Sequence, residues 1–403
     1  MEDRKFKIKF SYLIHRRIMS QRRKAESIAS AFSSPGKKPK QSNSIPPSPQ
    51  LMEVTTNNNG NAPVRAPSIS NRSIRNGDRS LSINKHNIKT REKESTFNDP
   101  IHGNITMDGL CLRIIDTKEF QRLRKLMQLG TCNYVFYGAT HTRFEHSIGV
   151  SHFAGKVVQN LQTSQPHLNI TDIDILCVKV AGLCHDLGHG PFSHVFDGVF
   201  IPRIDPNTSW RHEDGSVQML RHLMMKNKIH HSEYNLTDQD FLFIEEIIAG
   251  TSENNRKGRS YEKFYLYDIV NNSRSGLDVD KLDYFMRDMR YTNASSSTCN
   301  FQRFIELGRV YPAEPIETST TGRRPFENNS LPAEQEPYMI CYPEKMVKEA
   351  LDVFAVRFRL HQTIYTHKSV KKVEFMVSCV YLLIHSGFTS VIILVQHVLN
   401  AII

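Results

Sequence analysis

From about Phe97 onward, apolar residues recur at spacings of three and four, the pattern of helices that bury one face in a core. Few segments alternate with the period of two expected of a half-buried strand; residues 134–137 are a candidate for a short one. The pattern therefore predicts an all-α fold with minor short strands. The clearest helical patterns lie at residues 114–129, 144–161, 173–187, 217–225, 242–248 and 344–367.

Changes in composition divide the chain into segments. Residues 1–95 are rich in Ser, Asn and Pro and predict a disordered tail, because such a composition cannot build a core. Residues 96–311 predict the main helical domain, and residues 312–337, rich in Pro, Glu, Thr and Asn, predict a mobile insertion. Residues 338–374 predict a helical continuation of the domain, and residues 375–403 an atypical apolar C-terminus.

The positive charge of the chain is concentrated in the predicted tail. Residues 1–95 carry 20 Lys and Arg against 7 Asp and Glu, whereas the remainder carries 32 against 34. The net charge of +11 therefore belongs to the tail and not to the folded domain, which argues against nucleic-acid binding by the domain itself. Weak contact with single-stranded nucleic acid through the basic tail stays open.

Cysteine usage and apolar runs bear on the compartment. The 7 cysteines are scattered without CxxC spacing, which favours reduced thiols in a nuclear or cytoplasmic protein. Residues 375–403 contain no Asp, Glu, Lys or Arg, a run long enough to cross a bilayer. Because polar residues interrupt this run, we expect a buried helix or an atypical chain end rather than a membrane anchor.

The strongest chemical signal is the segment VKVAGLCHDLGHGPFSH at residues 178–194. His185 and Asp186 close an almost wholly apolar helix, and His189 and His194 follow among glycines and a proline. A buried His or Asp without a partner costs several kcal/mol, and one divalent cation can satisfy both. Nitrogen and oxygen donors together suit a borderline ion such as Zn, Fe or Mn.

Two other helical segments could complete such a site. His146 lies early on a helix whose predicted core face is Phe144, Ile148 and Phe153, with Arg143 three residues before it on the same side.

Further along the chain, a helical wheel over residues 275–291 groups Asp280, Tyr284, Arg287 and Asp288 in one wedge of about 100°. An acidic and aromatic wedge on a core-packed helix predicts a cleft wall. The alternative is a solvent face with an ordinary Asp283–Arg287 ion pair.

The ordered set His146, His185, Asp186 and Asp280 resembles the metal-ligand set of the HD-domain phosphohydrolases. A wider match, over about residues 97–310, is similar to the SAM-and-HD-domain deoxynucleoside triphosphate triphosphohydrolases and implies an HD-domain helical core. The segments that carry it are NDPIHG, RIIDTKEFQRLRKLMQLG, RFEHSIGV, AGLCHDLGHGPFSHVFDG, WRHEDGS and GLDVDKLDYFMRD.

This resemblance implies a reaction and its chemical groups. The metal held by the four ligands lowers the pKa of a water, which attacks the α-phosphorus to give a deoxynucleoside and inorganic triphosphate. His194 would be the general acid, His189 and His212 would face the phosphates, and Glu213 would orient a neighbouring histidine. The positions that would bind the triphosphate, together with Mg, are Arg143, Lys281 and Arg357.

The resemblance also implies how a deoxyribose is selected. Gln128 and Asp288 would hydrogen-bond the 3′-hydroxyl, and Leu129 would pack on the sugar or base. Tyr284 and Tyr365 would form an aromatic wall that leaves no room for a 2′-hydroxyl.

Finally, the family is activated by a guanine nucleotide (GTP) that promotes tetramer assembly. Asp116, Gln121 and Arg124 match guanine-contacting positions, although on one continuous helix Gln121 would lie off the face shared by the other two. A homo-oligomer, dimer or tetramer, is expected, weakened because the SAM domain and C-terminal lobe are missing. Positions that would contact a second, deoxynucleotide (dNTP) activator are Val135, Phe136, Arg309, His367 and Lys368.

Two other functions remain open at this point. An HD-type nuclease or cyclic-nucleotide phosphodiesterase would use the same metal site, although Tyr284, Tyr365 and the Gln128/Asp288 pair favour a nucleoside pocket. A truncated, non-catalytic nucleotide- or nucleic-acid-binding form is the other alternative.

Overall fold

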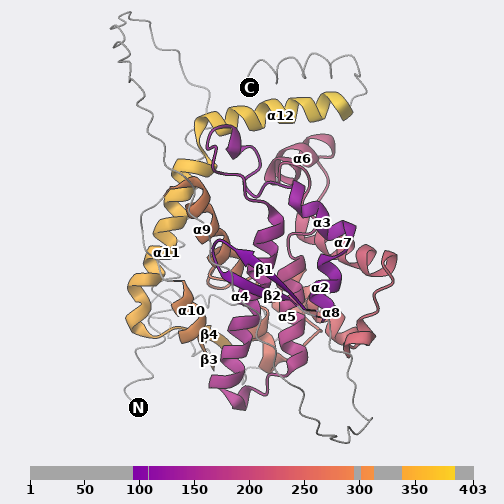
Figure 1. The fold of residues 1–403 in the computed structure, drawn as a ribbon, viewed down its shortest axis with the longest axis vertical. Helices are drawn as coiled ribbons and strands as arrows, with labels where there is room; N and C mark the ends of the chain where they lie inside the picture. The colour runs from indigo at the N-terminus through magenta and orange to yellow at the C-terminus, as the bar shows by residue number, and fades with distance from the viewer. Residues whose placement is uncertain (1–93, 108, 295–300, 313–337, 386–403) are drawn as a thin grey trace, which may run out of the picture. The chain divides into compact units, whose positions relative to one another are not determined.

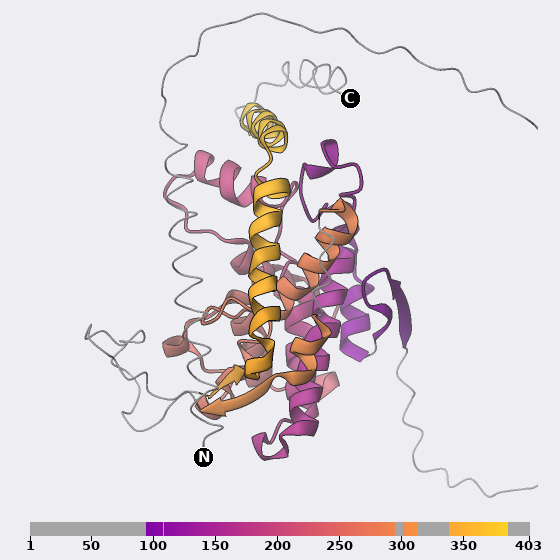
Figure 2. The same cartoon turned by 90° about the vertical axis from the view of Figure 1, so that its left-hand side faces the viewer.

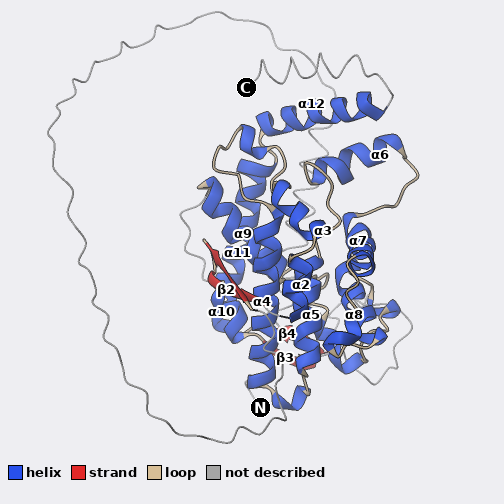
Figure 3. Cartoon of the chain, turned by 45° about the vertical axis from the view of Figure 1, so that its right-hand side comes forward, coloured by secondary structure: helices blue, strands red, loops and turns tan. Residues whose placement is uncertain are grey.

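The computed structural model describes residues 94–107, 109–294, 301–312 and 338–385 (Figure 1). Apart from their edge residues, the predicted basic tail and mobile insertion lie outside this part of the chain. Helices dominate the described residues, as the apolar pattern predicts, and Figure 3 shows the strands as a minor component.

The described strands form two antiparallel hairpins. One joins β1 (Ser95–Asp99) to β2 (Gly103–Met107), and the other joins β3 (Arg309–Pro312) to β4 (Tyr338–Cys341). The first hairpin begins at Ser95, which is the last residue of the predicted tail.

The strand predicted at residues 134–137 is wrong. Cys132–Tyr134 form a 3-10 helix, and local hydrogen bonds continue beyond it, with the Val135 amide donating to the Cys132 carbonyl at 3.0 Å. Backbone groups that are satisfied locally cannot also pair with a neighbouring strand.

Four helices build the centre of the fold. α4 (Arg143–Ser164) packs along α5 (Asp172–Cys184), α8 (Asp238–Ala249) packs on α5, and α9 (Val279–Thr292) packs on α4 (Figure 1). Close approach of α4 and α5 depends on Gly182, where a Cβ would already lie 3.3 Å from the Val150 carbonyl oxygen.

Capping boxes fix where α4 and α5 begin. Ahead of α4, the amide of Thr142 donates to the Glu145 carboxylate at 2.8 Å. Ahead of α5, the amide of Thr171 donates to the Asp174 carboxylate at 2.9 Å, and the Asp174 amide returns a bond to the Thr171 hydroxyl at 3.2 Å. Reciprocal bonds of this kind satisfy the free amides of a first turn.

The helix predicted over residues 114–129 is broken into pieces. α2 (Gly109–Ile115) ends early, Thr117 caps the short α3 (Lys118–Gln121), and a 3-10 helix follows at Arg122–Lys125. Thr117 competes with the helix through its hydroxyl, which accepts from the Phe120 amide at 3.3 Å.

The remaining elements cover this centre and extend it. The helices are α6 (Ile201–Ile204), α7 (His212–Lys226), α10 (Gln302–Leu307), α11 (Val347–Leu360) and α12 (Lys368–His385). The 3-10 segments are Pro166–Leu168, His231–Tyr234, Glu253–Asn255, Tyr261–Leu266 and Glu344–Met346, and the π-helical turns are Phe196–Phe200 and His361–Tyr365.

α12 crosses the domain boundary that we expected between residues 374 and 375 (Figure 2). Its Val370, Val377 and Ser378 are buried, whereas Phe375 is 60% exposed, so the apolar composition belongs to a partly covered helix. None of the described helices is long and apolar enough to cross a membrane, and residues 386–403 lie outside the described chain.

The start of α7 docks on the turn that follows α5. The buried hydroxyl of Ser216 accepts from the Gly188 amide at 2.8 Å and donates to the His185 carbonyl at 2.6 Å. A Cβ at Gly188 would lie 2.3 Å from the His212 carbonyl oxygen, so only glycine permits this approach. The contact holds the His185–Asp186 turn against α7.

We therefore expect Ser216→Ala to lower the free energy of unfolding by about 1–3 kcal/mol, because the buried Gly188 amide loses its acceptor. Ser232→Ala, at an exposed serine, should change it by no more than about 0.5 kcal/mol. Urea unfolding monitored by circular dichroism measures both values. Equal stability of the two variants would contradict the proposed docking contact.

Candidate metal centre and active site

The structure brings the four predicted metal ligands together from three helices. His146 lies in the first turn of α4, His185 and Asp186 follow the end of α5, and Asp280 lies in the first turn of α9. The Nε2 atoms of His146 and His185 are 3.1 and 3.4 Å from Oδ1 of Asp280. Both Nε2 atoms also lie 3.5 Å from a carboxylate oxygen of Asp186.

Both histidine rings are held so that Nε2 faces this group. Nδ1 of His146 is 2.7 Å from a carboxylate oxygen of Asp283, and Nδ1 of His185 is 2.9 Å from the Gly182 carbonyl. Each Nε2 atom is buried and has no hydrogen-bond partner among the described residues. Buried nitrogens left in this way, beside carboxylates, fit a divalent cation.

The charges of the site call for a cation as well. Burial opposes the charged form of His146, but the neighbouring Asp280 and Asp283 carboxylates outweigh it and raise its pKa to about 10. Burial likewise opposes a charge on His185, and the Asp186 and Asp280 carboxylates nevertheless raise its pKa. Two carboxylates in a buried pocket thus stabilise positive charge, which a divalent ion can supply in place of protons.

Arg143 stabilises Asp186 from the other side. Its buried guanidinium forms an ion pair with the Asp186 carboxylate and donates from Nε to the Ser193 hydroxyl at 3.0 Å. Phe192 and Ser193 both have positive φ, of 60° and 53°, so the loop is held in a strained conformation at this point. The arginine predicted to bind phosphate therefore contacts a candidate metal ligand directly.

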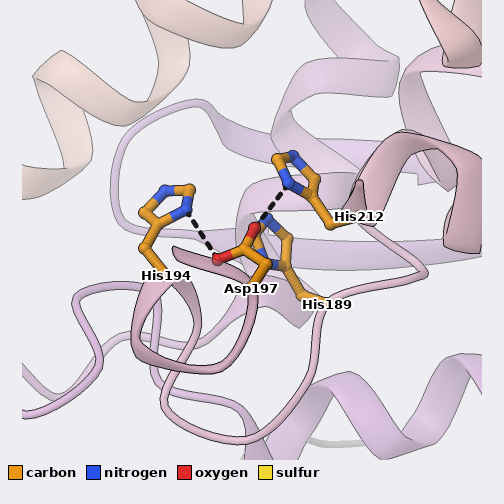
Figure 4. Close-up of side chains that lie close together, drawn as sticks. All are labelled: His189, His194, Asp197 and His212. Atoms are coloured by element: carbon orange, nitrogen blue, oxygen red, sulfur yellow. Dashed lines mark hydrogen bonds and ion pairs between the residues drawn. The ribbon is translucent and has the colours of Figure 1, made fainter. Parts of the chain in front are cut away.

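A second cluster consists of His189, His194, Asp197 and His212 (Figure 4). Asp197 lies between two of the histidines, with its carboxylate 2.8 Å from Nδ1 of His212 and 3.6 Å from Nδ1 of His194. The rings of His189 and His212 stack with centroids 3.9 Å apart. His189 also reaches Asp186, 3.3 Å from Nε2, and so connects the two clusters.

The surroundings assign different charges to these histidines. Burial and the charge of Arg143 hold the pKa of His189 well below its usual range. Burial also opposes a charge on His212, but its hydrogen bond to the Asp197 carboxylate raises its pKa. The side chain of His194 is 74% exposed and open to a ligand.

Asp197 was missed by the sequence analysis. We assigned the orientation of a histidine to Glu213, whose carboxylate is 3.6 Å from Nδ1 of His212, farther than that of Asp197. The available signal was the spacing of three between His194 and Asp197, but the chain passes through a π-helical turn at Phe196–Phe200, where helical spacing does not hold.

The residues predicted to bind the sugar also converge. The hydroxyl of Tyr365 donates to the Asp288 carboxylate, whose other oxygen is 2.7 Å from Nε2 of His141. The backbone amide of Gln128 donates to the His141 carbonyl at 3.0 Å. The side-chain oxygen of Gln128 is buried without a partner among the described residues. His141, which the sequence analysis missed, therefore contacts the side chain of Asp288 and the backbone of Gln128. Leu129, which follows Gln128 in the sequence, is partly buried and packs against the hydrophobic core.

The cationic residues Lys281 and Arg357 come from different helices, α9 and α11. Nζ of Lys281 is 2.6 Å from the Asp278 carboxylate, so it is not a plain surface lysine. The helix that carries Arg357, α11, packs on α9. The ring of Tyr284 lies 6.4 Å from that of His146.

The predicted wedge on α9 needs one correction. Arg287 does not share the cleft face with Asp280, and the alternative of a solvent-exposed ion pair with Asp283 is also wrong, because both residues are fully buried. Nη1 of Arg287 reaches Asp99 in β1 at 2.8 Å. A helical wheel cannot show this, since a long side chain bends away from its radial direction.

The predicted guanine-contacting segment is also changed by its broken helix. Nε of Arg124 donates to the Gln121 side-chain oxygen at 2.7 Å, so these two predicted guanine-contacting side chains lie together. Between them, Arg122 donates to the carbonyls of Leu187 and His189 at 2.6 and 2.9 Å, and so binds this segment to the turn after α5. Asp116 lies in the break between α2 and α3.

The structure brings together some of the residues predicted to contact a second, deoxynucleotide activator. The ring of Phe136, which follows Val135, lies 5.4 Å from that of His367, and Lys368 begins α12. Arg309, on β3, instead donates to the carbonyls of Glu306 and Gly308 at 2.9 and 2.6 Å.

If the first cluster binds the metal, the purified chain should hold about one divalent ion. We expect His185→Ala to remove it, and His194→Ala, in the second cluster, to retain it. Metal analysis by plasma mass spectrometry after desalting measures this. Loss of the ion from both variants to the same extent would show that the two clusters are not separate.

Comparison with known proteins agrees with this geometry. The family model for the HD domain matches residues 143–288, which include both clusters. Deoxynucleoside triphosphate triphosphohydrolase SAMHD1 of Mus musculus is 44% identical over 297 residues, 71% of this chain and 43% of its own length. SAMHD1 of Bos taurus is 42% identical over 75% of this chain and 50% of its own length. The SAMHD1 homolog of Dictyostelium discoideum is 37% identical over 73% and 50%, respectively.

The chain thus spans about half the length of the curated relatives it matches. The similarity runs through the residues that form the two clusters, and the fold around them is the helical one expected of this domain. On these grounds the chain belongs to the HD-domain family, within its SAMHD1-like group.

Proposed function

We propose that this chain is a metal-dependent dNTP triphosphohydrolase, which converts a deoxynucleoside triphosphate into a deoxynucleoside and inorganic triphosphate. The observation that carries the proposal is the pair of buried Nε2 atoms of His146 and His185, which have no hydrogen-bond partner among the described residues and lie beside Asp186 and Asp280. The SAMHD1 relatives, which are named deoxynucleoside triphosphate triphosphohydrolases, support this choice of substrate.

His146, His185, Asp186 and Asp280 would hold the metal. Two imidazoles and two carboxylates suit Zn, Fe or Mn, whereas Mg would accompany the triphosphate. When bound, such an ion supplies Lewis acidity toward a phosphate oxygen and lowers the pKa of a coordinated water.

The second cluster would handle the proton of the leaving group. Attack by water on the α-phosphorus breaks its bond to the 5′-oxygen, which then needs a proton. His194 is exposed enough to reach this oxygen, and its Nδ1 lies 3.6 Å from the Asp197 carboxylate. His189 and His212, with Glu213 and Asp197 beside them, would hydrogen-bond the phosphates.

Cationic side chains would bind the triphosphate. Arg143, Lys281 and Arg357 each lie next to a residue of the site, and a triphosphate carries about four negative charges that need such partners.

The sugar would bind against Asp288 and Gln128, with Leu129 below it and Tyr284 and Tyr365 as the wall. The carboxylate of Asp288, held between His141 and Tyr365, can accept from a 3′-hydroxyl. A wall selects by exclusion, so it would disfavour a ribose and accept different bases.

Regulation would involve a guanine nucleotide at Asp116, Gln121 and Arg124 and a dNTP at the residues predicted to contact a second activator. Arg122 supports this proposal, because it connects the first segment to the turn that carries Asp186. A homodimer or homotetramer in the nucleus or cytoplasm stays a prediction.

The reaction is tested by incubating the purified chain with dGTP, Mg and GTP and following inorganic triphosphate. We expect release by the native sequence and none above background by Asp186→Asn. His194→Ala should slow release by about 100- to 10,000-fold, the usual contribution of a general acid. Formation of a nucleoside monophosphate would instead indicate a nuclease or phosphodiesterase, and equal release by Asp186→Asn would exclude catalysis at this site.

Sugar selection is tested by Tyr365→Ala. Removing the wall should reduce the preference for dGTP over GTP, measured as the ratio of their kcat/KM values, by about tenfold or more. Tyr137→Ala is the control, because this tyrosine is 86% exposed and should leave the ratio unchanged. An unchanged ratio in Tyr365→Ala would contradict the assignment of the wall.

A further inference from the structure

Asp283 lies directly behind His146 and has no part in the reaction outlined above. Its fully buried carboxylate is 2.7 Å from Nδ1 of His146 and 2.5 Å from Nε2 of His102, in the turn between β1 and β2. Arg287 donates to both carboxylate oxygens, at 2.9 Å from Nε and 3.0 Å from Nη2. Both carboxylate oxygens of Asp283 therefore accept hydrogen bonds, and one of them lies at hydrogen-bond distance from a candidate metal ligand.

The backbone of α4 makes room for this carboxylate. At Gly149, one turn after His146, a Cβ would lie 2.1 Å from Oδ1 of Asp283 and 2.6 Å from Nη2 of Arg287. Any other residue would displace the carboxylate from His146. Glycine inside a helix is destabilising by about 1 kcal/mol relative to alanine, so its presence here is explained by the close approach.

We infer that Asp283 is a positioning residue that fixes the ring of His146 and keeps its proton on Nδ1, so that the Nε2 lone pair faces the metal. Carboxylates that accept a hydrogen bond from a metal-bound histidine orient the ring and make it a stronger ligand. The β1–β2 hairpin, through His102 and Asp99, holds this arrangement from outside. The inference rests on the proposed metal site but is independent of the substrate.

The competing explanation is that Asp283 only neutralises the buried Arg287. The structure offers a matched comparison, because Asp99 also neutralises Arg287, with its carboxylate 2.8 Å from Nη1. Only Asp283 also contacts His146. Removing either carboxylate should therefore weaken the fold in a similar way, whereas only the loss of Asp283 should weaken metal binding.

The test compares the full chain with Asp283→Asn and Asp99→Asn. Each is stripped of metal, and its affinity for Zn is measured by competition with a chromophoric chelator, beside the melting temperature of the metal-free protein. We expect both variants to have a lower melting temperature than the native chain. Only Asp283→Asn should bind Zn more weakly than the native chain, by about 10- to 100-fold. Unchanged affinity in Asp283→Asn, or an equal loss in Asp99→Asn, would overturn the inference. A native chain that binds no Zn would overturn the metal site itself, whatever its substrate.

If Asp283→Asn does not fold, the native chain still provides a test. Zinc-loaded protein labelled with nitrogen-15 in histidine is studied by NMR, with His146→Gln used to assign the His146 signals. We expect Nδ1 of His146 to carry the proton and Nε2 to bind the metal. A proton on Nε2 would contradict the role given to Asp283.

Discussion

Two imidazole nitrogens that are buried without a hydrogen-bond partner in the described part of the chain impose the main constraint on this structure. Nε2 of His146 and Nε2 of His185 face the carboxylates of Asp186 and Asp280 in a place shielded from water. Polar and charged groups lose much of their solvation free energy in such a pocket. An opposite charge held at short range compensates for this loss. A divalent cation meets that need for all four groups at once, and the surrounding structure serves to hold them at that point.

The supporting contacts come from segments far apart in the chain. Ser216 holds the turn after α5, and Asp283 holds the ring of His146. Gly149 and Gly188 lie where a side chain would force these elements apart. His189 connects the candidate metal centre to the second cluster, so a change in the turn after α5 would affect both. Arg122 reaches the same turn from the predicted regulatory segment.

The sequence predicted the helical fold and the four side chains that meet at the candidate metal centre, because long helices repeat apolar residues and the histidine and aspartate residues occur in a recognisable order. It did not predict Asp197 or His141, since these act through contacts between distant segments that spacing does not report. The predicted helix over residues 114–129 failed because the capping preference of Thr117 overrode the apolar repeat. Arg287 was misplaced because its partner Asp99 lies in a hairpin that no period-two pattern revealed.

X-ray absorption spectroscopy of the metal-loaded chain tests the central claim most directly, because it reports the ligand atoms without requiring turnover. The account predicts only nitrogen and oxygen neighbours at about 2.0–2.2 Å, with the outer-shell scattering of two imidazole rings. Scattering from cysteine sulfur, or the absence of imidazole scattering, would contradict a centre built from His146, His185, Asp186 and Asp280.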